Sequence, residues 1–213
     1  MAAIRAELQA FLRSTASSGR TIGQHKFGVY AFYDFDGEPI YVGQTCEGIG
    51  ARIGRHLTNQ RTDAVAMNVL DPFEVAEVRV WLFNLEGSTA REQREYLDRA
   101  EFTVFQKLLA ESKLGAVLNE KPPRVMQAVE LPPDYRSRII PADIFPHRKH
   151  PDVRLARRAS TIASLARVIS ERKVSRGLRQ TLLTQARRLE KLANDRLQDF
   201  PETPNSEDSD SDE

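Results

Sequence analysis

The hydrophobic and polar positions of the first 122 residues follow two periods, and each period predicts one type of element. Apolar residues three or four positions apart predict helices, whereas short aromatic and β-branched runs between turn residues predict strands. In chain order we expect a helix over residues 2–13, strands over 27–35 and 40–43, a helix over 51–59, a strand over 75–83 and a helix over 88–112. The turn residues Asp36-Gly37-Glu38-Pro39 separate the first two strands, which predicts a hairpin.

The pattern changes after residue 122. Seven of the 11 prolines fall between Pro122 and Pro151, and because proline fixes φ and lacks a backbone donor, this stretch is expected to be an extended connector. Apolar residues then recur at helical spacing as far as Leu197, with a break near residues 173–177, which predicts two helices folded back as a hairpin. Residues 201–213 contain no large apolar residue, so we expect a disordered acidic tail.

Charge is unevenly distributed along the 213 residues, although the net charge is only +1. Residues 1–146 carry 17 basic and 19 acidic residues, residues 147–200 carry 14 and 5, and residues 201–213 carry none and 6. A basic block of this kind is either a solvated helix face or a site for a polyanion such as nucleic acid. A single cysteine, Cys46, excludes an internal disulfide framework and a cysteine-rich zinc site. No apolar run is long enough to span a bilayer, and we expect no membrane partner and a cytoplasmic protein.

Three local features carry candidate chemistry. Glu101 interrupts the apolar stripe of the helix predicted over 88–112, where a carboxylate is costly unless it is paired or binds a metal; the plain alternative is a glutamate that reaches solvent or an arginine. Arg52 and His56 lie four apart and share a helix face, where they offer a phosphate ligand and a proton carrier, or an ordinary surface pair. Tyr30 and Tyr41 each lie near a glycine on predicted strands, as ligand-facing or packing residues.

Taken together, these residues resemble the motifs of the GIY-YIG nuclease family. Gly28-Val29-Tyr30 corresponds to the first triplet and Tyr41-Val42-Gly43 to the second, with ten residues between them. Arg52, Glu101 and Asn119 match the remaining motif positions in order, and His56 matches an Arg-x-x-x-His pattern that some restriction enzymes of the family carry. The resemblance covers about residues 27–122. The chain departs from it at Gln44, where many members have lysine.

The resemblance implies an α/β fold: a small antiparallel three-stranded sheet flanked by helices, here followed by a C-terminal helical hairpin. The strand–strand–helix–strand–helix order predicted from the pattern agrees with it. We therefore divide the chain into an N-terminal helix and connector (1–23), a nuclease domain (24–122), a proline-rich linker (123–152), a basic helical hairpin (153–200) and the acidic tail (201–213).

The resemblance also implies hydrolysis of DNA phosphodiester bonds with one divalent metal, Mg²⁺ or Mn²⁺. Glu101 would hold the metal, because Mg²⁺ keeps several waters and needs few protein ligands. Arg52 would bind the phosphate, and Tyr30 or His56 would be the general base. Tyr41 and Asn119 would complete the catalytic set by orienting the phosphate, a water or the site.

DNA is the expected partner, and a homodimer is possible because two-strand cutting is easiest with two sites. The residues assigned to nucleic-acid binding are Gly43, Gln44, Arg55, Arg157, Arg158, Lys173 and Arg176. The hairpin has a second interpretation, in which it packs on the nuclease domain or dimerises through its leucines. The alternative function is a non-catalytic nucleic-acid-binding or assembly protein that uses the basic hairpin. The sequence leaves RNA open as a substrate, and the acidic tail is either a solubilising end or a competitor of DNA for the hairpin.

Overall fold

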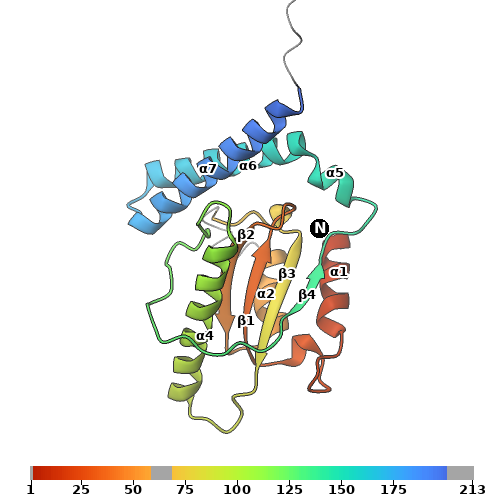
Figure 1. Cartoon of the computed structure of the whole chain (residues 1–213), viewed down its shortest axis with the longest axis vertical. Coiled ribbons are helices and arrows are strands. Elements are labelled where there is room, and N and C mark those ends of the chain that lie inside the picture. The colour runs from red at the N-terminus through yellow and green to blue at the C-terminus, as the bar shows by residue number, and fades with distance from the viewer. Residues whose placement is uncertain (1, 59–68, 201–213) are drawn as a thin grey trace, which may run out of the picture.

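The structure is a computed structural model that describes residues 2–58 and 69–200 (Figure 1). Its helices and strands are α1 (Ala2–Arg13), β1 (Phe27–Tyr33), β2 (Pro39–Thr45), α2 (Ile49–Thr58), β3 (Glu77–Phe83), α4 (Ala90–Glu111), β4 (Tyr135–Arg138), α5 (Phe145–Lys149), α6 (Pro151–Glu171) and α7 (Arg176–Gln198). Short 3₁₀ turns cover Ile22–Gln24 and Pro72–Glu74. The elements predicted from the hydrophobic pattern are all present, with ends that differ by a few residues.

One antiparallel sheet with the strand order β2-β1-β3-β4 forms the centre of the molecule. β1 pairs with β2 so that Tyr30 lies opposite Gly43 and Phe32 opposite Tyr41. Directly opposed residues share a face of the sheet, so both tyrosines of the two triplets point to the same side. β2 is an edge strand in this order, and its outer side is hydrogen-bonded by the Leu118 N–H at Ile40 and by the Asn119 side chain at Val42.

The prediction of a three-stranded sheet is wrong, because the described sheet has four strands. The fourth, β4, lies inside the proline-rich stretch that we expected to be only a connector, and it pairs with Glu77–Val80 of β3. Prolines cannot donate to a ladder, but Pro133 and Pro141 leave the residues between them free to pair with an edge. Ile139 and Ile140 follow the strand into the core, where both are buried.

Two hydrophobic cores cover the two faces of the sheet. On one face α1 and α2 pack against β1 and β3 through Leu8 and Ile53, and Leu165 of α6 joins the same core. On the other face α4 packs its apolar stripe against β1 and β2, and Trp81 of β3 is buried in the same core. Every residue of β1 is buried. The sheet is therefore sandwiched between helices, and α6 and α7 lie across one end of it (Figure 1).

Local signals in the sequence fix the ends of the long helices. The Thr89 hydroxyl accepts a hydrogen bond from the backbone N–H of Glu92, whose carboxylate accepts one from Thr89 in return, and this capping box begins α4. Pro151 occupies the first turn of α6, where its missing N–H costs nothing. The Ser175 hydroxyl caps α7 by accepting from the N–H of Leu178. The predicted break between the two helices is confirmed.

The α6–α7 hairpin is joined to the sheet by a buried ionic cluster around Asp34, which follows β1. One carboxylate oxygen of Asp34, Oδ2, accepts from Arg154 at 3.3 Å, Arg158 at 2.9 Å and Arg188 at 2.6 Å. The other oxygen, Oδ1, accepts from the backbone N–H groups of Asp36 and Glu38, which shapes the β1–β2 turn. All three arginines are almost fully buried. This arrangement shows the hairpin packed on the sheet domain, which was one of the two interpretations above.

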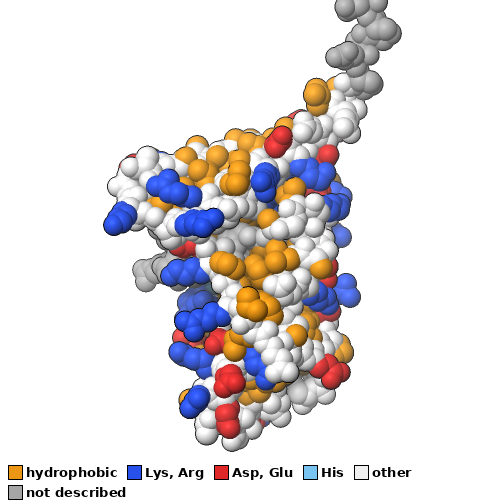
Figure 2. All heavy atoms as spheres, turned by 60° about the vertical axis from the view of Figure 1, so that its left-hand side comes forward, with side chains coloured by type: hydrophobic (Ala, Val, Ile, Leu, Met, Phe, Trp, Pro, Cys, Tyr) orange, Lys and Arg blue, Asp and Glu red, His pale blue; other side chains and the backbone are white. Residues whose placement is uncertain are grey.

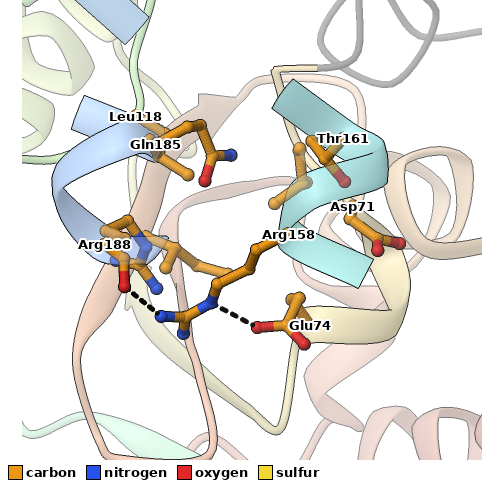
Figure 3. A pocket seen from close by; sticks show the side chains of 9 residues that line it. Asp71, Glu74, Leu118, Arg158, Thr161, Gln185 and Arg188 are labelled. Atoms are coloured by element: carbon orange, nitrogen blue, oxygen red, sulfur yellow. Dashed lines mark hydrogen bonds and ion pairs between the residues drawn. The ribbon is translucent and has the colours of Figure 1, made fainter. Parts of the chain in front are cut away.

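Two more carboxylates complete the cluster, and one of them, Asp36, pairs with Arg154 at 2.7 Å. Glu74 lies 3.0 Å from Nε of Arg158, whose Nη1 also donates to the backbone oxygen of Arg188 (Figure 3). The cavity between these groups, Leu118, Gln185 and Thr161 measures about 10 Å³, which is the size of a single water. This space is therefore too small for a substrate; a second cavity of about 160 Å³ borders the cluster at Asp34, Arg158 and Arg188. Within residues 2–58 and 69–200, no helix combines the length and apolarity that crossing a bilayer requires.

The leucines of the hairpin divide between its inner and outer faces. Leu178 and Leu192 are buried, whereas Leu183 and Leu197 are 45% and 70% exposed. The inner leucines contribute to packing on the sheet, and a homodimer through the outer ones stays a prediction.

Candidate active site

The motif residues meet at the β2 edge of the sheet, and Gly43 determines how closely the Tyr30 ring approaches the β2 backbone. A Cβ built on Gly43 would lie 2.7 Å from Cζ of Tyr30 and closer still to its hydroxyl. The ring of Tyr30 therefore lies directly on the Gly43 backbone, and its hydroxyl extends toward the strand edge. Tyr41, on the same strand as Gly43, flanks the Tyr30 ring, with 6.3 Å between the two ring centroids. The glycine of the second triplet is thus a requirement of close packing.

Arg52 reaches this hydroxyl from the first half of α2. Its Nε donates to Oη of Tyr30 at 3.3 Å. Burial raises the pKa of Tyr30 far above its usual range, and the Tyr41 hydroxyl adds to that effect, whereas the Arg52 charge and hydrogen bond oppose it. In the ligand-free protein Tyr30 is consequently a neutral hydroxyl beside a fixed cation.

His56 lies one turn further along α2, inside the aromatic cluster. Its ring centroid is 5.7 Å from that of Tyr30 and 5.3 Å from that of Tyr41. The residue is only 3% exposed, and neither ring nitrogen has a hydrogen-bond partner among the described residues. Burial, and then the charges of Arg52 and Arg55, lower the pKa of His56 to about 4. The structure therefore shows no hydrogen bond through which His56 would take the Tyr30 proton.

The low pKa of His56 predicts an acid-sensitive contribution to stability. The unfolded chain takes up a proton near pH 6.5, whereas folded His56 does so only near pH 4, so stability falls as the pH drops through that interval. Replacing His56 with phenylalanine removes this penalty. We expect the unfolding free energy of His56→Phe to gain about 2 kcal/mol on wild type between pH 7 and pH 5, measured by urea denaturation. A difference between the two proteins that does not change with pH would contradict the assignment.

Glu101 comes to the same edge from α4, on the opposite face of the sheet. Nε2 of Gln44 donates to Oδ1 of Asp98 at 2.5 Å and to Oε2 of Glu101 at 3.2 Å, so one amide bridges two carboxylates. Burial raises the pKa of Glu101 to about 7; the Gln44 hydrogen bond opposes this shift, and the Asp98 charge adds to it. Glu101 itself is partly exposed, and no ion pair joins it to an arginine among the described residues.

Charge effects connect the two halves of the site across the strand. The Arg52 charge lowers the pKa of Glu101, and the Glu101 charge raises that of Tyr30. These interactions act across the sheet at β2, where Gly43 has no side chain beside Tyr30. The edge therefore presents a cation, a carboxylate and a phenol close to one another.

Asn119 follows α4 and fixes the backbone of β2 between the two motif residues Tyr41 and Gly43. Its Oδ1 accepts from the N–H of Val42 at 3.1 Å, and its Nδ2 donates to the carbonyl oxygen of Val42 at 2.8 Å. The oxygen and the nitrogen of this side-chain amide both bond the β2 backbone, as the backbone of a neighbouring strand would. Asn119 is thus placed to orient the site and not to bind a phosphate.

The residues assigned to nucleic-acid binding fall into different surroundings. Gly43 lies beneath Tyr30, Gln44 is engaged by the two carboxylates, and exposed Arg55 pairs with Glu47 at 2.5 Å. Arg158 is buried in the Asp34 cluster, and Arg157 pairs with Asp71 at 2.7 Å. Of the hairpin residues named, only Lys173 and Arg176 are exposed and without an ion pair in the described part of the chain.

A hard divalent cation fits the donors present at this edge. Glu101 and Asp98 offer carboxylate oxygens, the ligands that Mg²⁺ prefers, and both carboxylates accept from Nε2 of Gln44. Within the described ranges no group of three or more His, Cys, Asp or Glu side chains could enclose a metal by itself. The sequence signal for Asp98 was its position three residues before Glu101, on the same helix face, and the sequence reasoning missed it.

Comparisons of the chain with protein-family models, with curated proteins and with solved structures find no match. The resemblance to the GIY-YIG family therefore rests on the motif residues themselves.

Proposed function

We propose that this chain is a metal-dependent endonuclease of the GIY-YIG type that hydrolyses DNA phosphodiester bonds at the β2 edge of the sheet. The observation that carries the proposal is the joint placement of Arg52 on the Tyr30 hydroxyl and of Glu101 on Gln44 at that edge. A phosphate ligand, a phenol and a carboxylate in one place are what phosphodiester hydrolysis needs.

Each residue has a separate task in the proposed reaction. Arg52 binds the non-bridging oxygens of the scissile phosphate and offsets the charge that grows on them. Glu101, assisted by Asp98, holds the metal. When bound, the cation supplies charge stabilisation at the scissile phosphate and the leaving oxygen. Asn119 holds the β2 backbone, and Tyr41 packs beside Tyr30 and limits the space in which water can stand.

Tyr30, rather than His56, faces the attacking water in this proposal. Tyr30 Oη is the oxygen to which Arg52 donates. Burial keeps the phenol neutral in the metal-free protein, so it must lose its proton before it can accept one from water; the Arg52 charge favours that loss, and a cation held at Glu101 would add to it. His56 is enclosed by aromatic rings and has a pKa of about 4, which makes it a weak base near neutral pH. Its contribution is to support the position of the two tyrosines.

A plasmid-nicking assay tests the proposal. Supercoiled plasmid incubated with the full chain is expected to become nicked or linear in Mg²⁺ or Mn²⁺ and to remain intact in EDTA, because phosphate charge must be neutralised by a cation held at Glu101. Discrete fragments would indicate sequence-specific cutting, and a smear would indicate non-specific cutting.

The same assay contains the outcome that opposes the proposal. Intact plasmid in every metal, together with retained DNA binding in a gel-shift experiment, would indicate the alternative function, a non-catalytic nucleic-acid-binding protein. The exposed cations of the hairpin support this alternative, because they could bind nucleic acid without any cleavage.

A further inference from the structure

Most basic residues of the α6–α7 hairpin and its connection fall into two sets that the sequence does not distinguish. The others, Arg157, Lys191 and Arg196, form ion pairs with acidic residues nearer the surface. The inner set, Arg154, Arg158 and Arg188, is buried and paired with Asp34. The outer set is exposed, and its side chains have no ion pair or hydrogen bond to other described residues; it comprises Arg167, Arg172, Lys173, Arg176, Arg179 and Arg187. The inner set fixes the hairpin, which leaves the outer set available for a partner.

Four members of the outer set gather at the hairpin tip, which we define as residues 171–179. The tip contains Arg172, Lys173, Arg176 and Arg179, with Glu171 as its one acidic residue. In Figure 1 the α6–α7 connection lies at one end of the hairpin, above β2 and α4. Figure 2 shows blue side chains at that end and further blue side chains below it on the same side of the molecule. Such a surface attracts a polyanion.

Direct contacts hold the tip beside the candidate site. The Ser175 hydroxyl donates to Oε1 of Glu120 at 2.8 Å. A Cβ built on Gly177 would lie 2.9 Å from the carbonyl carbon of Glu120 and closer still to its oxygen, so α7 begins in contact with that backbone. Glu120 adjoins Asn119, whose amide is bonded to Val42 of β2. The two consecutive residues Asn119 and Glu120 thus contact both the β2 strand and the hairpin tip.

We propose that the hairpin tip binds backbone phosphates of the DNA whose scissile phosphate lies at the β2 edge. The inference rests on the proposed function for the identity of the polyanion. Arg and Lys side chains on rigid helices are suited to phosphate contacts that position a duplex without reading its bases. Because the inner arginines and the Glu120 contact hold the hairpin in place, the tip cations are preorganised relative to Arg52.

The test compares two double variants that lose the same charge. Lys173→Gln/Arg176→Gln removes two tip cations, and the control Arg13→Gln/Lys149→Gln removes two exposed cations at the ends of α1 and α5. Binding of a labelled DNA duplex to the full chain is measured by fluorescence anisotropy in EDTA, across about 50 to 200 mM salt. The tip variant is expected to bind roughly 10–100-fold more weakly near 0.1 M salt, with a salt slope reduced by about 1.8. The control variant is expected to keep the wild-type affinity and slope.

The outcomes separate this inference from the nuclease proposal. A tip variant that binds like the control, or a wild-type chain with no measurable affinity for DNA, would overturn the inference. Because the binding is measured in EDTA, absence of cleavage by the wild type would count against the nuclease and leave the tip result unchanged. Conversely, a wild type that cleaves, beside a tip variant with unaltered binding, would retain the nuclease and remove the tip from it.

Discussion

The Glu101→Gln variant is expected to cleave DNA at least ~10³-fold more slowly than the wild type in Mg²⁺, a loss of roughly 4 kcal/mol of transition-state stabilisation. Glutamine keeps the size of the side chain and can still accept from Gln44, so the packing at the β2 edge is preserved. What it removes is the negative charge that would hold the cation. Initial rates of plasmid nicking under matched protein and metal concentrations measure the effect.

Stability separates a lost function from a lost fold in this variant. Burial and the Asp98 charge hold the pKa of Glu101 near 7, above its ordinary value, so the ionised form costs stability as the pH rises through that range. Glu101→Gln is therefore expected to be at least as stable as the metal-free wild type at pH 8. Glu95→Gln, on the exposed face of the same helix, is the matched control and should cut normally. Wild-type cutting by Glu101→Gln would remove the metal site from this edge.

The fold was predictable where one element is described by its own hydrophobic period. β1 and α4 show this: β1 is a short aromatic run bounded by turn residues, and the stripe of α4 is buried as a whole. β4 was missed because the prolines that flank it disfavour strand pairing locally. Pairing became favourable there because β3 has an edge with which β4 can form hydrogen bonds. Local propensity was overridden by a partner far away in the chain.

The candidate site was predictable in its residues but not in its contacts. Ordered motifs indicated Tyr30 and Glu101, and the structure brings both to one strand edge. The lack of a hydrogen bond to His56 and the bridge from Gln44 to Asp98 depend on side-chain directions that spacing does not define. The hairpin shows the same limit, since Arg158 and Arg176 look equivalent in the sequence and only the position of Asp34 separates a buried anchor from a free cation.

Removal of the Asp34 charge is expected to have the largest effect on stability of any single change considered. Asp34→Asn leaves three buried guanidinium groups with Glu74 and the half-exposed Asp36 as their remaining paired carboxylates, and it turns an N–H group toward donors that need an acceptor. Burial already lowers the pKa of Arg188, which shows how costly its charge is there. Breaking a buried ion pair on one side costs about 3–5 kcal/mol, and we expect a loss of that size in urea denaturation.

A matched exposed pair and a compensating change make this expectation specific. Asp195→Asn breaks the Lys191–Asp195 pair on the surface of α7, where both side chains are about half exposed, and should cost about 0.5 kcal/mol or less. Adding Arg188→Met to Asp34→Asn removes one of the stranded cations, so the double variant should lose clearly less than the sum of the two single changes. Additive losses, or an Asp34→Asn variant as stable as Asp195→Asn, would mean that the cluster does not hold the hairpin. The position of the tip beside β2 would then depend on its other contacts, the Ser175–Glu120 hydrogen bond and the Arg157–Asp71 ion pair.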